Sequence, residues 1–171
     1  DEITAVMDEP AKQPIRVYAS LASADSELER AQVLLAEIDR TGALDRSVFA
    51  IFSPTGSGYV NYVACETLEY LTRGDCASAC IQYSVLPSWL SFLVDQRASQ
   101  EEAQALWQAV LAAVAVLPAD ARPRLAVSGE SLGAFAAQAV FPDATPATVV
   151  EAADAAVWIG SPGTSALWPA W

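Results

Sequence analysis

Short apolar runs alternate with longer segments of helical periodicity along most of this chain of 171 residues. Brief apolar runs bounded by turn residues are typical of buried strands, and apolar residues three and four positions apart are typical of helices with one buried face. Strands are predicted at residues 15–19, 47–52, 77–84, 124–128 and 155–160. Helices are predicted at residues 26–40, 61–72, 99–117 and 132–140. Consecutive strands joined through helices need right-handed crossovers, so we expect an α/β fold with a mainly parallel sheet of about five strands and helices on both faces.

Capping residues support three of these helices. Ser26 and Glu29 have the spacing of a capping box, in which each side chain accepts a hydrogen bond from the other residue's backbone N–H. Ser99 and Glu102 repeat the pattern before the third helix, and Asn61 is a good N-cap for the second. We therefore expect these three helices to begin beside Ser26, Asn61 and Ser99.

Composition limits the organisation and the partners of the chain. Hydrophobic residues make up 53% and charged residues 18% of the sequence, which is typical of one globular domain with a substantial core. Residues 1–13 are acidic and contain proline, so they are predicted to be a linker before a domain at residues 14–171. The net charge of -12 argues against nucleic acid as a partner. No apolar run approaches the roughly 20 residues that a membrane-spanning helix needs.

The three cysteines suggest structural roles. Cys65, Cys76 and Cys80 have no metal-binding spacing and the chain has no histidine, so we expect no metal and no cofactor. Cys76 and Cys80 would lie about 13 Å apart along a strand, too far for a disulfide. The helix after Asn61 should run antiparallel to the following strand, which would bring Cys65 near Cys80. In an oxidising compartment a Cys65–Cys80 disulfide is the easier bridge, and three buried free thiols are the alternative.

Residues Gly129-Glu130-Ser131-Leu132-Gly133 carry the clearest chemical signal. They read G-x-S-x-G between a predicted strand and a predicted helix, which is the context of the nucleophile elbow of α/β-hydrolases. Side chains at either glycine would collide with neighbouring elements, so glycine fits a sharp turn that exposes a nucleophilic Ser131. The alternative is a glycine-bounded turn with an ordinary surface serine.

The loop at residues 53–58 is the second candidate part of a site. In open parallel sheets ligands bind at the carboxyl ends of the strands, and α/β-hydrolases place an oxyanion donor in the loop two strands before the elbow. We expect the N–H of Leu132 and the N–H of Thr55 or Gly56 to form an oxyanion hole. A flexible glycine loop without this role is the alternative.

An apolar segment, residues 85–94, should lie beside the same edge of the sheet. It is interpreted either as a packed core helix or as an apolar wall or lid for an acyl chain. On the second interpretation Tyr83, Trp89 and Phe92 are candidate substrate-binding residues.

The rest of a catalytic triad is not visible in the sequence. In α/β-hydrolases the acid and the histidine follow the nucleophile in chain order. Asp143, Glu151 and Asp154 all precede the last predicted strand, so none has the usual position of the acid. We therefore expect a hydrolase domain that stops before its acid and histidine, and a chain that is inert or nearly so by itself.

Four segments form longer patterns: Pro14-Ile-Arg-Val-Tyr18, Pro54-Thr-Gly-Ser-Gly-Tyr59, the run from Gln82 to Asp95, and Gly129-Glu-Ser-Leu-Gly133. Together they resemble a family of actinobacterial membrane proteins, in which transmembrane helices precede an extracytoplasmic α/β-hydrolase domain. The resemblance covers most of residues 14–168. It implies that Ser131 is the nucleophile, and that the native protein has membrane helices upstream and more hydrolase downstream.

These features lead to three functional hypotheses. The first is a serine esterase or acyltransferase acting on an acyl ester, with a cell-envelope lipid suggested by location. The second is a non-catalytic, hydrolase-like module that binds lipid or protein. The third is a structural half whose last strand pairs with a companion polypeptide or with another copy, which would supply the remaining strands.

Overall fold

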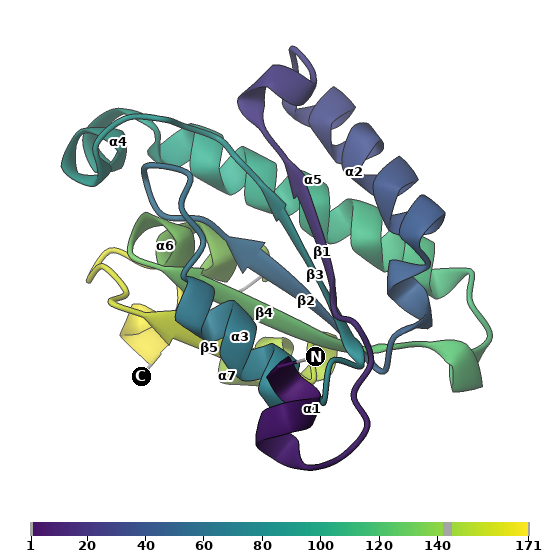
Figure 1. The fold of residues 1–171 in the computed structure, drawn as a ribbon. Coiled ribbons are helices and arrows are strands. Elements are labelled where there is room, and N and C mark those ends of the chain that lie inside the picture. The colour runs from purple at the N-terminus through teal and green to yellow at the C-terminus, as the bar shows by residue number, and fades with distance from the viewer. Residues whose placement is uncertain (1, 142–144, 171) are drawn as a thin grey trace.

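A five-stranded parallel sheet forms the centre of the protein (Figure 1). The computed structural model describes residues 2–141 and 145–170. The strand order is β1-β3-β2-β4-β5, and every pair of neighbours is parallel. The strands are β1 (Ile15–Ala19), β2 (Val48–Ser53), β3 (Cys76–Ile81), β4 (Arg124–Glu130) and β5 (Ala155–Ile159). The α/β fold with a parallel sheet is thus confirmed, and all carboxyl ends of the strands lie at one edge.

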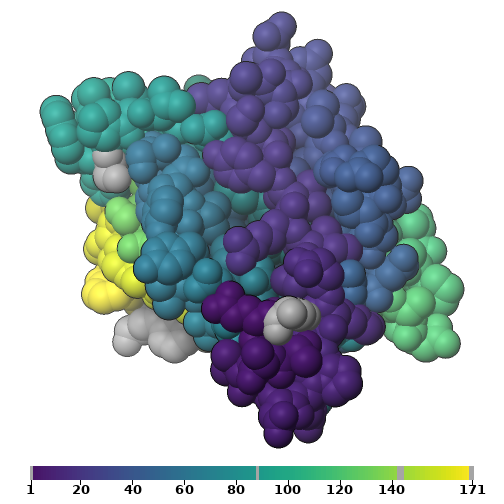
Figure 2. Space-filling view, in the orientation of Figure 1, coloured from purple at the N-terminus to yellow at the C-terminus, as the bar shows by residue number. Residues whose placement is uncertain are grey.

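Helices cover both faces of this sheet, as predicted. They are α1 (Glu2–Met7), α2 (Glu27–Thr41), α3 (Tyr62–Leu71), α4 (Ser88–Val94), α5 (Gln96–Ala115), α6 (Leu132–Gln138) and α7 (Pro146–Ala152). Side chains of α2, α5, α6 and α7 pack in one core with the strands, whereas α3 covers the opposite face. In the space-filling view α1 and α4 project at opposite ends of the molecule (Figure 2).

Two of the three predicted helix starts are confirmed. The Ser26 side chain accepts from the Glu29 N–H and the Glu29 carboxylate accepts from the Ser26 N–H. The Asn61 side chain accepts from the N–H groups of Val63 and Ala64 in α3. The predicted start at Ser99 is wrong, because α5 begins at Gln96 and the Ser99 hydroxyl donates to the Gln96 carbonyl inside the helix.

The two faces have separate cores, because side chains alternate along each strand. On β2, Phe49 and Ile51 belong to the large core with α2 and α5, while Ala50 and Phe52 belong to the smaller cluster under α3. All six residues of β2 are buried, which fits its place in the middle of the sheet.

The segment predicted to be a linker contains α1, which lies next to α3. Ile3 of this helix is buried. Lys12 then donates its N–H to the Arg73 carbonyl, and its ammonium lies 2.9 Å from the Asp75 carboxylate. The residues before β1 are therefore attached near the C-terminal end of α3.

The three cysteines are buried free thiols in the structure. Cys65 of α3 and Cys80 of β3 lie in the same apolar cluster. Burial raises the pKa of Cys65 to about 11, so the thiol is a poor nucleophile near neutral pH. A Cys65–Cys80 disulfide stays a prediction.

Candidate active site

Ser131 lies at a sharp turn between β4 and α6. Its φ of 56° and ψ of -118° place a non-glycine residue in a region that costs on the order of 1–3 kcal/mol. Two hydrogen bonds hold this backbone: the Ser131 N–H donates to the Ile159 carbonyl of β5, and the Ser131 carbonyl accepts from the Phe135 N–H. Strand, strained serine and helix follow one another as a nucleophile elbow requires.

The two glycines of the motif occupy positions without room for a side chain. A Cβ on Gly129 would lie 2.3 Å from the Gly133 carbonyl oxygen. A Cβ on Gly133 would lie 2.2 Å from the carbonyl oxygen of Ser53 at the end of β2. Gly129 therefore lets α6 fold back against β4, and Gly133 lets α6 touch the loop after β2.

The loop after β2 leaves the sheet beside the elbow. β2 and β4 are paired neighbours, with Ser53 opposite Gly129. Within the loop the Thr55 N–H donates to the Tyr59 carbonyl, and the Gly58 N–H donates to the Thr55 carbonyl, each at 2.9 Å.

The backbone N–H groups near Ser131 differ in whether they already donate a hydrogen bond. The Thr55 N–H is already bonded, whereas the Gly56 N–H has no acceptor among the described residues. Leu132 is the first residue of α6, and the first N–H groups of a helix have no partner within it. Of the two loop donors predicted from sequence, the geometry favours Gly56.

Glu130, the residue before Ser131 in the G-x-S-x-G motif, connects the elbow to α3, which covers the other face of the sheet. Asn61 donates from its amide to the Glu130 carboxylate at 2.8 Å, while its carbonyl oxygen caps α3. No sequence pattern indicates this contact, because the two residues are 69 positions apart. It ties the start of α3 to the start of α6.

The three residues predicted to bind substrate have different environments. Tyr83 is buried with Leu132 and Phe135, and burial raises its pKa. Phe92 packs against the same cluster and meets the Phe135 ring edge-on, with centroids 6.5 Å apart. Trp89 is 69% exposed.

Helix α4 thus has two unlike faces. Its inner face carries Ser91 and Phe92, while Trp89, Leu93 and Val94 are exposed on the outside. The packed face agrees with the core-helix interpretation of segment 85–94 in part, and an apolar wall or lid for an acyl chain stays a prediction. Tyr83, which precedes α4, is buried.

Asp154, the acidic residue directly before β5, lies far from Ser131. The Asp154 carboxylate accepts from the Leu125 N–H at the start of β4, which is the far end of that strand from the serine. Glu151 is exposed on α7, and Asp143 lies outside the described residues.

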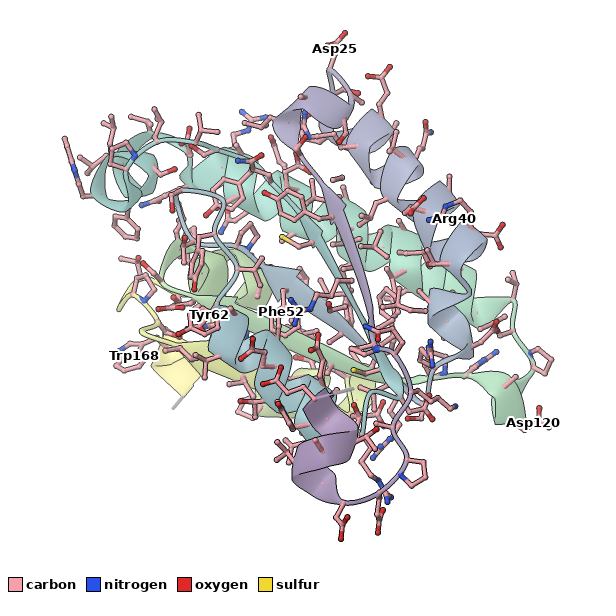
Figure 3. The ribbon with its side chains drawn as sticks, in the orientation of Figure 1. Asp25, Arg40, Phe52, Tyr62, Asp120 and Trp168 are labelled. Atoms are coloured by element: carbon pink, nitrogen blue, oxygen red, sulfur yellow. The ribbon has the colours of Figure 1, made fainter. Side chains whose placement is uncertain are left out.

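Cavities lie on both sides of α3. An apolar groove of about 430 Å³ runs between α3 and the strands β4 and β5, and its lining extends from Phe52 and Ile159 to Leu71 and Ala155. A cavity of about 180 Å³ on the other side of α3 is lined by Phe52 and Tyr62, both labelled in Figure 3. Ser131 lines neither of them.

A parallel sheet, a strained serine between strand and helix, and a glycine loop at the neighbouring strand end define the α/β-hydrolase class. Comparison with protein families agrees: the chain belongs to the alpha/beta-hydrolase family, which matches residues 15–171. Membership of this family indicates a hydrolase in general. Comparisons with curated proteins and with solved structures found no match. Among the described residues no helix is long and apolar enough to cross a membrane.

Proposed function

We propose that this protein is a serine hydrolase of the esterase or acyltransferase type, with Ser131 as its nucleophile. The strained backbone of Ser131 at the turn between β4 and α6 is the observation that carries this proposal. Such strain persists only where the surrounding structure imposes it, and it is common at active sites.

The proposed reaction has two steps. The Ser131 hydroxyl attacks the acyl carbonyl carbon while a general base takes its proton, and the carbonyl oxygen becomes an oxyanion. The N–H groups of Leu132 and Gly56 would donate to that oxyanion. Collapse of the intermediate expels the alcohol, which takes the proton, and leaves an acyl-serine. Water or a second alcohol then attacks the acyl-serine and gives its proton to the base, which passes it to the Ser131 oxygen as the acyl group leaves as an acid or a new ester.

The base and the acid need a source outside these residues. The sequence contains no histidine. We propose that a histidine and its acidic partner come from polypeptide beyond the 171 residues, either further hydrolase sequence of the native protein or a companion chain. This chain by itself should then hydrolyse esters slowly or not at all. The proposed machinery needs no metal and no cofactor.

The proposed substrate is an acyl ester, with a cell-envelope lipid as the leading example. The exposed apolar side chains of α4 beside the elbow suit an acyl chain better than a polar substrate. The resemblance to membrane-anchored actinobacterial hydrolases adds a proposed location at the extracytoplasmic face of the membrane.

Fluorophosphonate labelling of the full-length protein tests the nucleophile. We expect labelling at Ser131 and its loss in Ser131→Ala, with ester hydrolysis reduced by at least about 10⁴-fold because the nucleophile acts at both steps. Ser128→Ala, three residues earlier on β4, is the matched control and should label normally. Equal labelling of Ser131→Ala and the unsubstituted protein would refute the proposal.

A non-catalytic binding module is the second candidate. It is favoured by the lack of histidine and by the exposed apolar face of α4. On this reading the full-length protein resists labelling, and Ser131→Ala binds acyl-lipid vesicles as well as the unsubstituted protein does. Labelling at Ser131 would exclude it.

A further inference from the structure

Two buried hydroxyl groups outside the loop at residues 53–59 bind its carbonyl groups. The Tyr83 hydroxyl, just beyond β3, donates to the Pro54 carbonyl at 2.9 Å. The Ser91 hydroxyl of α4 donates to the Gly56 carbonyl at 2.8 Å. Tyr83 is 7% exposed and Ser91 is fully buried. Both contacts come from the segment between Gln82 and Asp95.

These two bonds flank the peptide group that matters for the proposed chemistry. The peptide between Thr55 and Gly56 carries the unengaged Gly56 N–H, and its own carbonyl accepts from the Gly58 N–H. A peptide group is planar, with its N–H and C=O pointing in opposite directions, so fixing one carbonyl fixes the direction of the N–H in the same plane. The preceding peptide is held by Tyr83 and the following one by Ser91. Hydrogen bonds to the peptide groups before and after it therefore restrict the orientation of the peptide that carries the Gly56 N–H.

Ser91 is itself held by a short polar network. Its hydroxyl lies 2.7 Å from the Asp95 carboxylate, so its single proton is shared between Asp95 and the Gly56 carbonyl. The Ser84 hydroxyl donates to the same Asp95 oxygen at 2.6 Å and accepts from the Leu86 N–H. The network anchors α4 to the end of β3 and keeps Ser91 opposite the loop.

Packing alone does not require these hydroxyl groups. A buried hydroxyl costs free energy unless it is hydrogen-bonded, so phenylalanine at position 83 and alanine at position 91 would fill much of the same space without that cost. What the hydroxyl groups add is a fixed direction for the carbonyl groups that they bind. A glycine loop needs such external support, because glycine leaves the backbone many accessible conformations.

We propose that Tyr83 and Ser91 are positioning residues of the oxyanion hole, and that they orient the Gly56 N–H by holding the carbonyl groups on either side of it. The inference rests on the proposed function, and it gives Tyr83 a different role from the substrate contact expected from sequence. Electrostatic stabilisation by a fixed donor depends on its direction, so a loosened loop should lose transition-state binding and keep ground-state binding.

The test compares Tyr83→Phe and Ser91→Ala with the unsubstituted full-length protein in ester hydrolysis. We expect each substitution to lower kcat by about 10- to 100-fold, with KM changed by less than about threefold, as for a misplaced oxyanion donor. Phosphonylation of Ser131 by a fluorophosphonate should slow by a similar factor, because that step forms the same kind of charged oxygen. Thermal unfolding of the isosteric Tyr83→Phe variant checks that the fold is kept.

Tyr18→Phe is the matched control. The Tyr18 hydroxyl also donates to the loop, at the Gly58 carbonyl, but it is half-exposed and does not flank the Gly56 N–H. Its kcat should stay within about twofold of the unsubstituted value, since no donor of the oxyanion is disturbed. An equal loss in Tyr18→Phe and Tyr83→Phe would overturn the inference, because general loop stability would then explain both.

Two further outcomes would also overturn it. If Tyr83→Phe and Ser91→Ala keep full kcat while Ser131→Ala is inactive, the nucleophile stands and the positioning role fails. A raised KM with unchanged kcat in Tyr83→Phe would restore the substrate contact expected from sequence. If Ser131→Ala itself keeps labelling and activity, the proposed function fails first.

Discussion

The two faces of the central sheet are closed to different degrees. On one face α2, α5, α6 and α7 enclose a continuous core around residues such as Phe49. On the other face α3 covers a small cluster around Phe52, and an apolar groove of about 430 Å³ stays open beside it. Val157 and Ile159 of β5 are 55% and 42% exposed on that side. The closed face therefore provides most of the packing, whereas the open face leaves apolar surface exposed.

Two phenylalanines of the same strand test this comparison most directly. Phe49 is fully buried in the closed core, and Phe52 faces the α3 side and lines the open groove. Phe49→Ala should lower the free energy of unfolding by about 3–5 kcal/mol, because it leaves a sealed cavity. Phe52→Ala should cost about 1–2 kcal/mol less, because it enlarges a space that is already open. Urea unfolding of both variants measures the difference, and an equal or larger loss in Phe52→Ala would contradict the comparison.

An ion pair on each face gives a second test. Arg30 of α2 and Glu102 of α5 are buried together, whereas Arg16 of β1 is half-exposed and pairs with Glu69 of α3. At about pH 8, Arg30→Met should cost about 3 kcal/mol, because it leaves a buried carboxylate without its cation. Arg16→Met should cost less, about 1–2 kcal/mol, because Arg16 itself is half-exposed, although its partner Glu69 is buried. Denaturant titrations check this, and the prediction fails if Arg16→Met is the more damaging change.

The closed face should also make stability depend on pH. Burial raises the pKa of Glu102 to about 7, although the hydrogen bond from Arg30 lowers it. Between about pH 5 and pH 7 the folded protein holds a proton that the unfolded chain has released, so raising the pH should reduce stability, by about 1–3 kcal/mol. Glu102→Gln should remove most of this slope. A stability that stays level or rises over this range would rule out the proposed role of Glu102.

The sequence predicted correctly the features that depend only on residues close together in the chain. The strands, the Ser26 and Asn61 caps and the close packing at Gly129 and Gly133 follow from periodicity and backbone geometry, and the structure agrees with each. The cap predicted at Ser99 failed because Glu102 pairs with Arg30, which is 72 positions away. A capping box and a buried ion pair place the same residue types at the same spacing, and only the packing of α2 on α5 distinguishes them.

The candidate site likewise combines features that the sequence predicted with features that only the structure shows. The sequence predicted the serine, the elbow and the loop, but it left Thr55 and Gly56 as equal donors. The turn to Tyr59 engages the Thr55 N–H and leaves the Gly56 N–H unengaged. The contacts of Tyr83 and Ser91 with that loop are 29 and 35 positions apart in the chain, and no periodicity reports them.

By itself the sequence determined the α/β class, the order of its elements and the identity of the candidate nucleophile. Each depends on the side-chain pattern of neighbouring residues, and that pattern is local. Tertiary structure alone decided which face of the sheet is closed, which N–H group is unengaged and which hydroxyl groups hold the loop. Those outcomes depend on groups that meet only when β3 and α4 lie beside the end of β2, and a linear pattern carries no record of that proximity.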